Sequence, residues 1–579
     1  MSQKSKPRTP QKSSYRGFEG INLKKTHSGD ESIAFIKNFR ILDDGSLQKR
    51  CGFQSVYKSS NNHPDITASH SIIENGVEVC YFIESSYVRK YNSSTQEISD
   101  IGEFSTPTDN AFFFEYLDKL FVCNGSHILA IENSSITEPY FYIPLYGKEW
   151  HAFAGEINEV PNLLWNKVAI SYKLPSPATS YLSIGKLKLQ SIDAVYKNGE
   201  LLAEGTYSFN ERYNSISVPE FAENDTFLAI ITFDGDEYYK KQREALTHSC
   251  ATSVFYELNK NNLFFWGANT TNKVFYSTSL NEENAKITNL HPKNGTFYVP
   301  LDSFFTVASE KDRIRAFIRH YDRVLIMTDS STWITNLQDL ENGSLKIRNI
   351  NNSIGCIVKN GCVRIENTLF SVGKDAIYAW TTDTDELNEC NAHSISDPIA
   401  DLLDQNFFAN CSVHLNYDMR EIWFYNSMRD TVWIYNYKQK LWYSYGEFTP
   451  SVILDGGAYA RFFEGVLLCV FNPSLSADIR NNTITQITAT LKSGELEFNT
   501  KQKKKLSSTT VRGKINGGSI KLQVTLDGKK TLVYDVSPSN SHSVIPFRTR
   551  SGSFSSMCFE LTATGKGEQI IHGIELEAD

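Results

Sequence analysis

The chain lacks the signatures of several protein classes. Its ten cysteines are spread singly with no C-x-x-C pair, and several lie in apolar runs, such as Cys80 in VEVCYFI and Cys469 in VLLCVF. Because a free cysteine packs as a small apolar side chain, this pattern favours a protein of a reducing compartment without a disulfide framework. The sequence has no run of about 18 apolar residues, and its basic first fifteen residues precede no apolar segment. We therefore expect neither a membrane-spanning segment nor secretion.

Catalytic motifs are also missing. The sequence contains no H-E-x-x-H, no G-x-S-x-G, no G-x-x-x-x-G-K and no zinc-like spacing of His and Cys. The repeated S-x-D-x-G-x-T-W turn of sialidases is absent as well. We therefore assign no catalytic, cofactor-binding or metal-binding residue, and we expect a protein that is not an enzyme and has no cofactor.

Some residues nevertheless resemble parts of active or binding sites. Carboxylates that lie close together in a polar loop are usually solvated, so we do not interpret either acidic group as a glycosidase pair. His320 is interpreted as a packed histidine, and the Asp43-Asp44-Gly45 turn lacks the later ligands of a calcium loop. The basic run 501–505 has no interleaved aromatic residues for base stacking and is interpreted as a solvated loop. The acidic candidates are Asp234, Asp236 and Glu237, and Asp383, Asp385 and Glu386.

The composition favours a packed β protein. Aromatic residues form 13% of the chain, with 36 Phe and 29 Tyr, and charged residues form 21%. The net charge of −8 is mild for this length and does not indicate a general nucleic-acid-binding surface.

One hairpin pattern returns seven times: an apolar strand, a short polar turn and a second apolar or aromatic strand. All but one of the spacings between copies are near the roughly 40 to 50 residues of a four-stranded propeller blade. The larger spacing leaves room for an inserted domain. The sequence therefore predicts an all-β fold, a β-propeller of six to eight blades, in which N-terminal strands complete a sheet begun by the last blade near residue 470. The copies begin at Val79, Lys119, Asn262, Arg323, Thr368, Glu421 and Val466.

Two further β units accompany the propeller. In the inserted unit, Asn198-Gly199 joins two alternating strands, which is a strong two-residue hairpin signal and favours a small β-sandwich. The last hundred residues alternate with turns at Gly517-Gly518 and Asp527-Gly528 and end in a closing pair, SMCFELTATG and QIIHGIELEAD, which predicts a second sandwich of jelly-roll-like type. The predicted domains are a flexible tail 1–15, propeller 16–139, inserted sandwich 140–238, propeller 239–483 and C-terminal sandwich 484–579.

The segment from Phe18 to Phe53 carries the pattern G-x-N, x-x-N-h-x-h and G-x-L-x-x-R-x-G-h, and it resembles the start of β-propeller proteins from bacteriophage tails. Similar elements follow at Tyr321-Asp322-Arg323 with Trp333, in the blade from Ile354, where Ala376 replaces the usual Gly, in the short helix of 394–399, and in the strand pair from Trp433. The residues in the N-terminal pattern are Gly20, Asn22, Asn38, Phe39, Gly45, Leu47, Arg50, Gly52 and Phe53.

This resemblance implies a non-enzymatic structural component of a phage tail, such as a nozzle, hub or adaptor, located in the virion and assembled in the host bacterial cytoplasm. Its implied partners are other tail or connector proteins and further copies of itself around the tail axis, with contact to DNA in the lumen or to the host surface left open. Two alternatives remain: a receptor- or glycan-binding tail protein, and a polysaccharide-degrading tail enzyme.

Overall fold

The computed structural model of the protein describes residues 11–25, 33–58, 66–105, 110–116, 118–146, 159–173, 181–218, 222, 225–257, 260–268, 272–278, 298–320, 323–340, 345–380, 392–447, 450–453, 459–462, 467–472, 474–480, 483–498, 502–536, 544–547 and 551–579. Within these residues the fold is almost entirely β.

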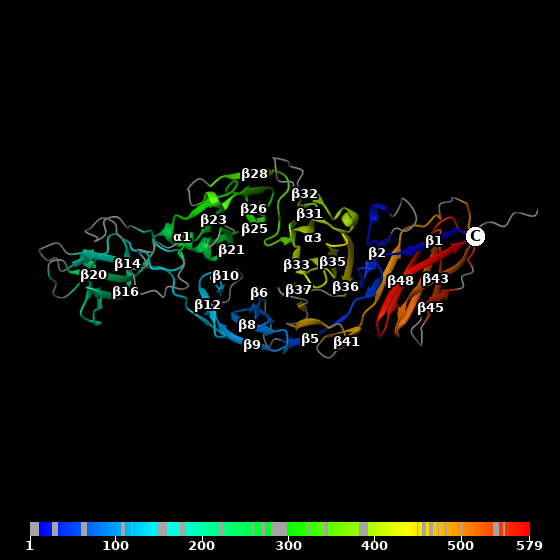
Figure 1. The fold of residues 1–579 in the computed structure, drawn as a ribbon, viewed down its shortest axis with the longest axis horizontal. Coiled ribbons are helices and arrows are strands. Elements are labelled where there is room, and N and C mark those ends of the chain that lie inside the picture. Colours follow the sequence, from blue (N-terminus) through cyan, green and yellow to red (C-terminus); the bar gives the residue numbers. More distant parts are fainter. Residues whose placement is uncertain are drawn as a thin grey trace, which may run out of the picture.

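Six antiparallel units of four consecutive strands follow one another around a central region of the molecule (Figure 1). The first strands of neighbouring units pack against each other in the order β6, β10, β21, β25, β29 and β33. The strands of the first three units are β6 (Ile66–Glu74), β7 (Val77–Glu84), β8 (Tyr87–Asn92) and β9 (Ile98–Glu103); β10 (Phe112–Tyr116), β11 (Lys119–Cys123), β12 (Ile128–Glu132) and β13 (Ser135–Thr137); and β21 (Cys250–Glu257), β22 (Lys260–Trp266), β23 (Lys273–Tyr276) and β24 (Phe304–Thr306).

The other three units lie later in the chain. Their strands are β25 (Ile314–His320), β26 (Arg323–Thr328), β27 (Thr332–Thr335) and β28 (Ile347–Asn351); β29 (Cys362–Ile365), β30 (Thr368–Val372), β31 (Ile377–Trp380) and β32 (Ala392–Ser394); and β33 (Ser412–Asn416), β34 (Glu421–Tyr425), β35 (Thr431–Asn436) and β36 (Leu441–Gly446). Short helices connect some of the elements: η3 (Leu337–Asp339), η4 (Asp397–Leu402) and α3 (Gln405–Ala409).

Six of the seven predicted hairpins are confirmed, and each is formed by the second and third strands of its unit. Tight turns also set the register of other neighbouring strands within a unit. Between β6 and β7, for example, Glu74 pairs with Val77, and the two loop residues Asn75 and Gly76 have φ of 51° and 79°, as a two-residue hairpin requires.

The seventh predicted hairpin is wrong, because an N-terminal strand lies between its two strands. β39 (Leu467–Asn472) and β40 (Ala477–Arg480) both pair with β5 (Gly52–Lys58), β39 antiparallel and β40 parallel. The prediction that N-terminal strands complete a sheet near residue 470 is thereby confirmed. The other strands of this seventh sheet are β37 (Pro450–Ile453), β38 (Tyr459–Phe462) and β41 (Thr483–Gln486).

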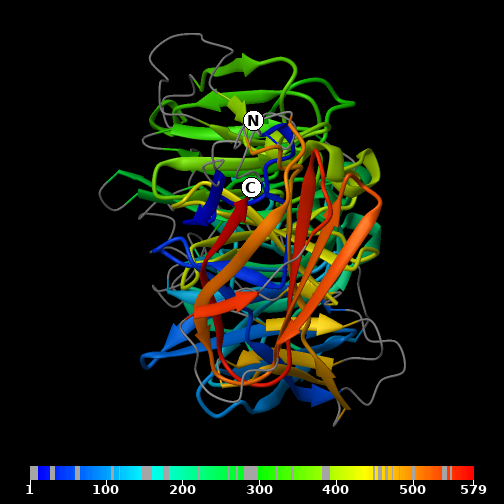
Figure 2. The same cartoon turned by 90° about the vertical axis from the view of Figure 1, so that its right-hand side faces the viewer.

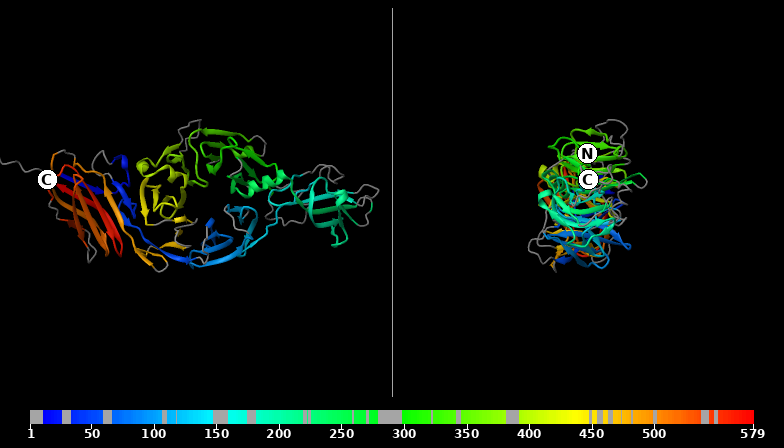
Figure 3. Two further views of the ribbon diagram at one scale, coloured as in Figure 1. Left: turned by 180° about the vertical axis from the view of Figure 1, so that it is seen from behind. Right: turned by 90° about the vertical axis from the view of Figure 1, so that its left-hand side faces the viewer.

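The inserted unit extends from one end of the elongated molecule, opposite the C-terminal sandwich (Figures 1 and 3). Asn198 and Gly199, with φ of 52° and 86°, form the predicted two-residue hairpin, in which Lys197 pairs with Glu200. Its two sheets contain β14 (Lys167–Lys173), β20 (Thr226–Asp234), β16 (Lys188–Lys197) and β17 (Glu200–Leu201), and β15 (Tyr181–Ser183), β19 (Ser215–Ser217) and β18 (Ser208–Asn210), with η2 (Glu211–Tyr213) and the following α1 (Glu237–Thr247).

The C-terminal sandwich, seen face-on in Figure 2, contains strands from both ends of the chain. The prediction that the last two strands pair with each other is wrong, because β47 and β48 belong to different sheets. The connection between these two strands contains Gly565 and Gly567, with φ of 92° and 97°. One sheet contains β42 (Ala489–Ser493), β47 (Met557–Thr564), β44 (Ser519–Leu526) and β45 (Lys530–Val536); the other contains β43 (Leu506–Ile515), β48 (Gln569–Ala578), β46 (Val544–Phe547), β1 (Gln11–Arg16), β3 (Phe39–Ile41) and β4 (Leu47–Lys49).

Two predicted boundaries at the N-terminus are wrong. Residues 11–15 are not a flexible tail, because β1 pairs with β48 along its whole length. Arg16 and Arg512 both contact Glu575, and these two cations lower the pKa of Glu575 to about 2. The start of the predicted propeller segment 16–139 also belongs elsewhere, because β4 pairs with β48 and β2 (Ile33–Lys37) pairs with β42. Residues 1–10 lie outside the described part of the chain.

No helix within the described ranges is long and apolar enough to span a membrane.

Candidate functional site

Residues 33–58, here called the junction segment, connect the C-terminal sandwich to the seven sheets. Strand β2 lies between β36 of the sixth unit and β42 of the sandwich, so that these two sheets become one continuous nine-stranded sheet. Strands β3 and β4 then extend the opposite sandwich sheet, and β5 enters the seventh sheet. One short stretch of chain therefore contributes strands to three separate sheets.

Asn38 is a hydrogen-bonding centre at this junction. It is fully buried and has φ of 59°, a conformation that Asn tolerates better than most residues. Its amide Nδ2 donates to the Thr488 carbonyl at 2.8 Å, and its Oδ1 accepts from Arg50 Nε at 3.0 Å and from the Gly446 amide at 2.9 Å. A single side chain thus joins the sixth unit, the junction segment and the entry to the sandwich.

Arg50 and Asp478 form a buried ion pair. The two side chains are 1% and 2% exposed, and two parallel hydrogen bonds of 2.8 Å join the guanidinium of Arg50 to the carboxylate of Asp478. The amide of Phe53 also donates to Asp478 at 3.3 Å. Because a charge without its partner is costly in such a buried position, this pair fixes the place of β5 relative to β40.

A second buried carboxylate lies close by. Glu421 is fully buried and accepts hydrogen bonds from Tyr443 Oη at 2.6 Å and Trp423 Nε1 at 2.7 Å, while Arg40 Nε lies 3.1 Å from its Oε1. Burial raises the pKa of Glu421, and the positive charge of Arg40 opposes that increase. This network joins strand β3 to the sixth unit.

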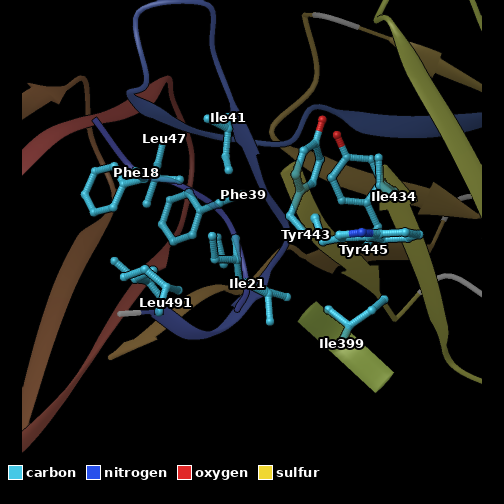
Figure 4. Close-up of a cluster of buried hydrophobic side chains, with 14 of the residues drawn as sticks. Phe18, Ile21, Phe39, Ile41, Leu47, Ile399, Ile434, Tyr443, Tyr445 and Leu491 are labelled. Atoms are coloured by element: carbon cyan, nitrogen blue, oxygen red, sulfur yellow. The ribbon is translucent and has the colours of Figure 1, made fainter. Parts of the chain in front are cut away.

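Other residues of the N-terminal pattern have steric roles. Gly52 passes so close to the Ala477 carbonyl that a Cβ would lie 1.9 Å from its oxygen, and Gly20, at φ of 77°, would bring a Cβ within 2.8 Å of the Trp442 carbonyl. Figure 4 shows Phe39 and Leu47 among the apolar side chains that fill the space between the sheets. The N-terminal pattern therefore contains residues that join the C-terminal sandwich to the seven sheets.

A cavity of about 1220 Å³ opens among the first strands of four units, β6, β10, β29 and β33. His70 of β6 lies 2.7 Å from the Glu115 carboxylate of β10, and this hydrogen bond lowers the pKa of Glu115. His414 and Asp418 of the sixth unit line the same space. Strands far apart in the sequence therefore converge on one central cavity.

The first acidic group selected from the sequence has structural partners. Asp234 accepts from Lys188 at 2.8 Å and from Lys240 at 2.6 Å, and these contacts lower its pKa to about 2. Asp236 caps α1 through a hydrogen bond of 2.8 Å from the Tyr239 amide, and Glu237 lies in the first turn of that helix. The second group, Asp383, Asp385 and Glu386, lies outside the described residues, as do Tyr321 and Asp322.

The other selected residues also have identified positions. His320 is buried in β25, and burial lowers its pKa. In the basic run, Lys504 is buried and donates to the Glu497 carbonyl at 2.6 Å, so the interpretation of that run as a solvated loop is wrong at this position. Asp44 accepts from the Ser46 amide at 2.9 Å and shapes the turn. Among the described residues no group of three or more His, Cys, Asp or Glu could hold a metal ion.

Sequence reasoning missed Glu421 and Asp478, the acidic partners at the junction. The available signal was a carboxylate at the edge of an apolar strand, as in EIWFY, which indicates a buried ionic partner. Nothing local identifies the partners, because Glu421 pairs with Arg40 from the N-terminal part of the chain, and Arg50 and Asp478 are 428 residues apart.

No known protein family and no curated protein matches the chain. Among solved structures, the AfRom2 CNH domain has 6% identity and a TM-score of 0.35, with 73% of this chain and 99% of that chain covered. BBS1N in complex with ARL6DN has 10% identity and a TM-score of 0.27, covering 73% and 98%. An exo-beta-1,3-galactanase from Phanerochaete chrysosporium has 10% identity and a TM-score of 0.20, covering 75% and 99%.

Proposed function

We propose that the seven sheets form a closed β-propeller and that the protein is a non-enzymatic structural component of a bacteriophage tail. Support for closure comes from the packing of successive first strands, from the central cavity that four of them line, and from the pairing of β5 with β39. A ring whose last sheet contains a strand from the other end of the chain resists opening at that sheet, because the two ends of the ring cannot separate there without breaking the pairing.

The observation that carries the functional proposal is the junction segment. The residues through which the chain resembles phage tail propellers are the same ones that bind the sandwich to the seven sheets, through Asn38, Arg50 and Gly52. A body of this kind transmits force between its two ends. In a tail, several copies around the axis would contact each other and the neighbouring tail or connector proteins, in a virion assembled in the bacterial cytoplasm.

The test is the composition and structure of a purified phage particle from the host that encodes this chain. We expect mass spectrometry to find the polypeptide in the tail fraction, and electron microscopy to resolve it in several symmetry-related copies. Particles that assemble intact tails without the polypeptide would contradict the proposal.

A second candidate function, glycan binding, is favoured by an aromatic pair on the inserted unit. Tyr181 and Tyr213 are 44% and 58% exposed, and their ring centroids lie 5.7 Å apart. The guanidinium of Arg212 lies 5.5 Å from the Tyr213 ring. Exposed aromatic rings stack on the apolar faces of sugars, and a neighbouring cation suits an acidic glycan.

If this pair binds glycans, the variant Tyr181→Ala/Tyr213→Ala will lose binding on an array of bacterial surface glycans by about tenfold or more, a loss of roughly 1.4 kcal/mol. The matched control is Tyr140→Ala, at another tyrosine that is 69% exposed. Equal signals from the double variant and the wild type, or no signal from either, would contradict this second function.

A further inference from the structure

A second cavity, of about 410 Å³, lies where the junction segment meets the sixth unit, the seventh sheet and the sandwich. It is lined by Arg40, Lys49 and Arg50 of the junction segment, by Ser474 and Ser476 before β40, and by Glu568 before β48. Three cations therefore converge on one cavity from a single stretch of eleven residues, 40–50.

The charges of these three cations are not neutralised equally. Arg50 is matched by Asp478, and Arg40 by Glu421. Lys49 is only 6% exposed, and its ammonium donates to the Gly565 carbonyl, a neutral acceptor. Within the described part of the chain, Lys49 has no carboxylate partner. Glu568, the acidic residue of the lining, forms an ion pair of 2.6 Å with Lys514.

An ammonium group has three protons to donate, so Lys49 retains donor capacity after its bond to Gly565. Burial, and after it the neighbouring charge of Arg50, lower the pKa of Lys49 to about 8, so the charged ammonium is costly in this position and an anion beside it would offset that cost. Ser474 and Ser476 line the same space, and a serine hydroxyl is a donor suited to an oxyanion.

We propose that this cavity, here called the junction pocket, binds a phosphate-sized oxyanion, either free inorganic phosphate or the phosphate group of a monoester. The bound anion neutralises Lys49 and adds a link between the junction segment and the loop before β40. Because the anion binds the folded junction and not the separated strands, occupancy stabilises the attachment of the sandwich.

The experiment is a thermal-unfolding titration of the full chain at pH 7 with inorganic phosphate, against chloride at equal ionic strength. We expect the melting temperature of the wild type to rise with the logarithm of the phosphate concentration once that concentration exceeds a millimolar dissociation constant. Phosphate also stabilises proteins in general by exclusion from their surfaces, but that effect is the same in a variant that lacks the site. Calorimetric titration of the folded wild type with phosphate gives the affinity directly.

Lys49→Met removes the charge and keeps most of the apolar stem. We expect its phosphate affinity to fall about tenfold or more, as the loss of one charge-assisted hydrogen bond implies. In chloride the variant should melt at or above the wild-type temperature, because an unmatched buried charge is removed. The control, Lys505→Met, changes an exposed lysine of the same sandwich and should keep the wild-type phosphate affinity and melting response. Ser476→Ala provides a second, smaller change in the junction pocket and should weaken binding in the same direction.

Glycerol phosphate, titrated in parallel, distinguishes the two sources of the group. If only inorganic phosphate binds, the ligand of the junction pocket is the free ion. If glycerol phosphate binds as well, the pocket also accepts the phosphate group of a monoester. A wild-type protein without a saturable calorimetric binding isotherm for phosphate, or an equal phosphate affinity in Lys49→Met, would overturn the proposal.

Discussion

A chain that lacks residues 1–58 will not fold into a soluble monomer. The deletion removes β1 to β5, and with them the strand between β39 and β40 and the strand between β36 and β42. It also removes nine buried apolar side chains, each worth about 1.5 to 3 kcal/mol. Their sum, about 14 to 27 kcal/mol, equals or exceeds the roughly 5 to 15 kcal/mol by which a domain is usually stable. These side chains are Tyr15, Phe18, Ile21, Ile33, Ile36, Phe39, Ile41, Leu47 and Phe53.

The deletion is measured by size-exclusion chromatography and circular dichroism of the truncated protein. Its control replaces residues 167–234 of the inserted unit by a short linker, because the strands of that segment pair with one another, apart from one bridge between Ala169 of β14 and Leu145. We expect this control to stay soluble and to keep the cooperative unfolding of the remaining sheets. A peptide of residues 11–58 added to the truncated chain should restore β structure. A soluble truncated monomer with the wild-type melting temperature would refute the role of the junction segment.

Breaking the buried pair of Arg50 and Asp478 will destabilise the protein by about 3 to 5 kcal/mol, because either single substitution leaves the other charge buried without its partner. The variants are Arg50→Met and Asp478→Leu, measured as the shift of the urea midpoint. Arg50→Lys should also lose stability, since an ammonium cannot form the two parallel hydrogen bonds seen here.

The double variant Arg50→Met/Asp478→Leu tests whether stability is lost through an unpaired buried charge or through the changed size of the side chains. Replacing both charges by apolar groups removes the unmatched charge, so we expect the double variant to be more stable than either single variant. Lys188→Met serves as the control, because its pair with Asp234 is largely exposed and contributes little to stability. Single variants that unfold at the wild-type midpoint would mean that this pair does not hold the junction together.

Local patterns in the sequence predicted the local structure well. Apolar strands on either side of a polar turn identified six central hairpins, and Asn198-Gly199 identified the turn of the inserted unit, because such hairpins depend on neighbouring residues alone. The place of β5 near residue 470 was also predicted, since an incomplete last sheet requires a strand from elsewhere.

The pairings that the sequence did not reveal are those between distant segments. Nothing in the IAFIK strand indicates that Ile33 pairs with Ser493, and nothing around Gly565 indicates that β47 and β48 separate into two sheets. The contacts of the junction segment were hidden for the same reason. The resemblance identified Asn38 and Arg50, but their partners Thr488 and Asp478 lie hundreds of residues away and become neighbours only in the folded chain.

A disulfide across β5 and β39 tests the junction most directly. Ser55 lies opposite Cys469 in the register of these antiparallel strands, and opposed residues of such a pair have Cα atoms roughly 4.5 to 5.5 Å apart, within the range of a disulfide. We expect Ser55→Cys, after oxidation, to yield a crosslinked peptide that joins residues 55 and 469 in mass spectrometry of the folded protein. Free thiols at both positions in the folded, oxidised variant, or crosslinks from position 55 only to cysteines other than Cys469, would contradict the closure of the last sheet by the N-terminal segment.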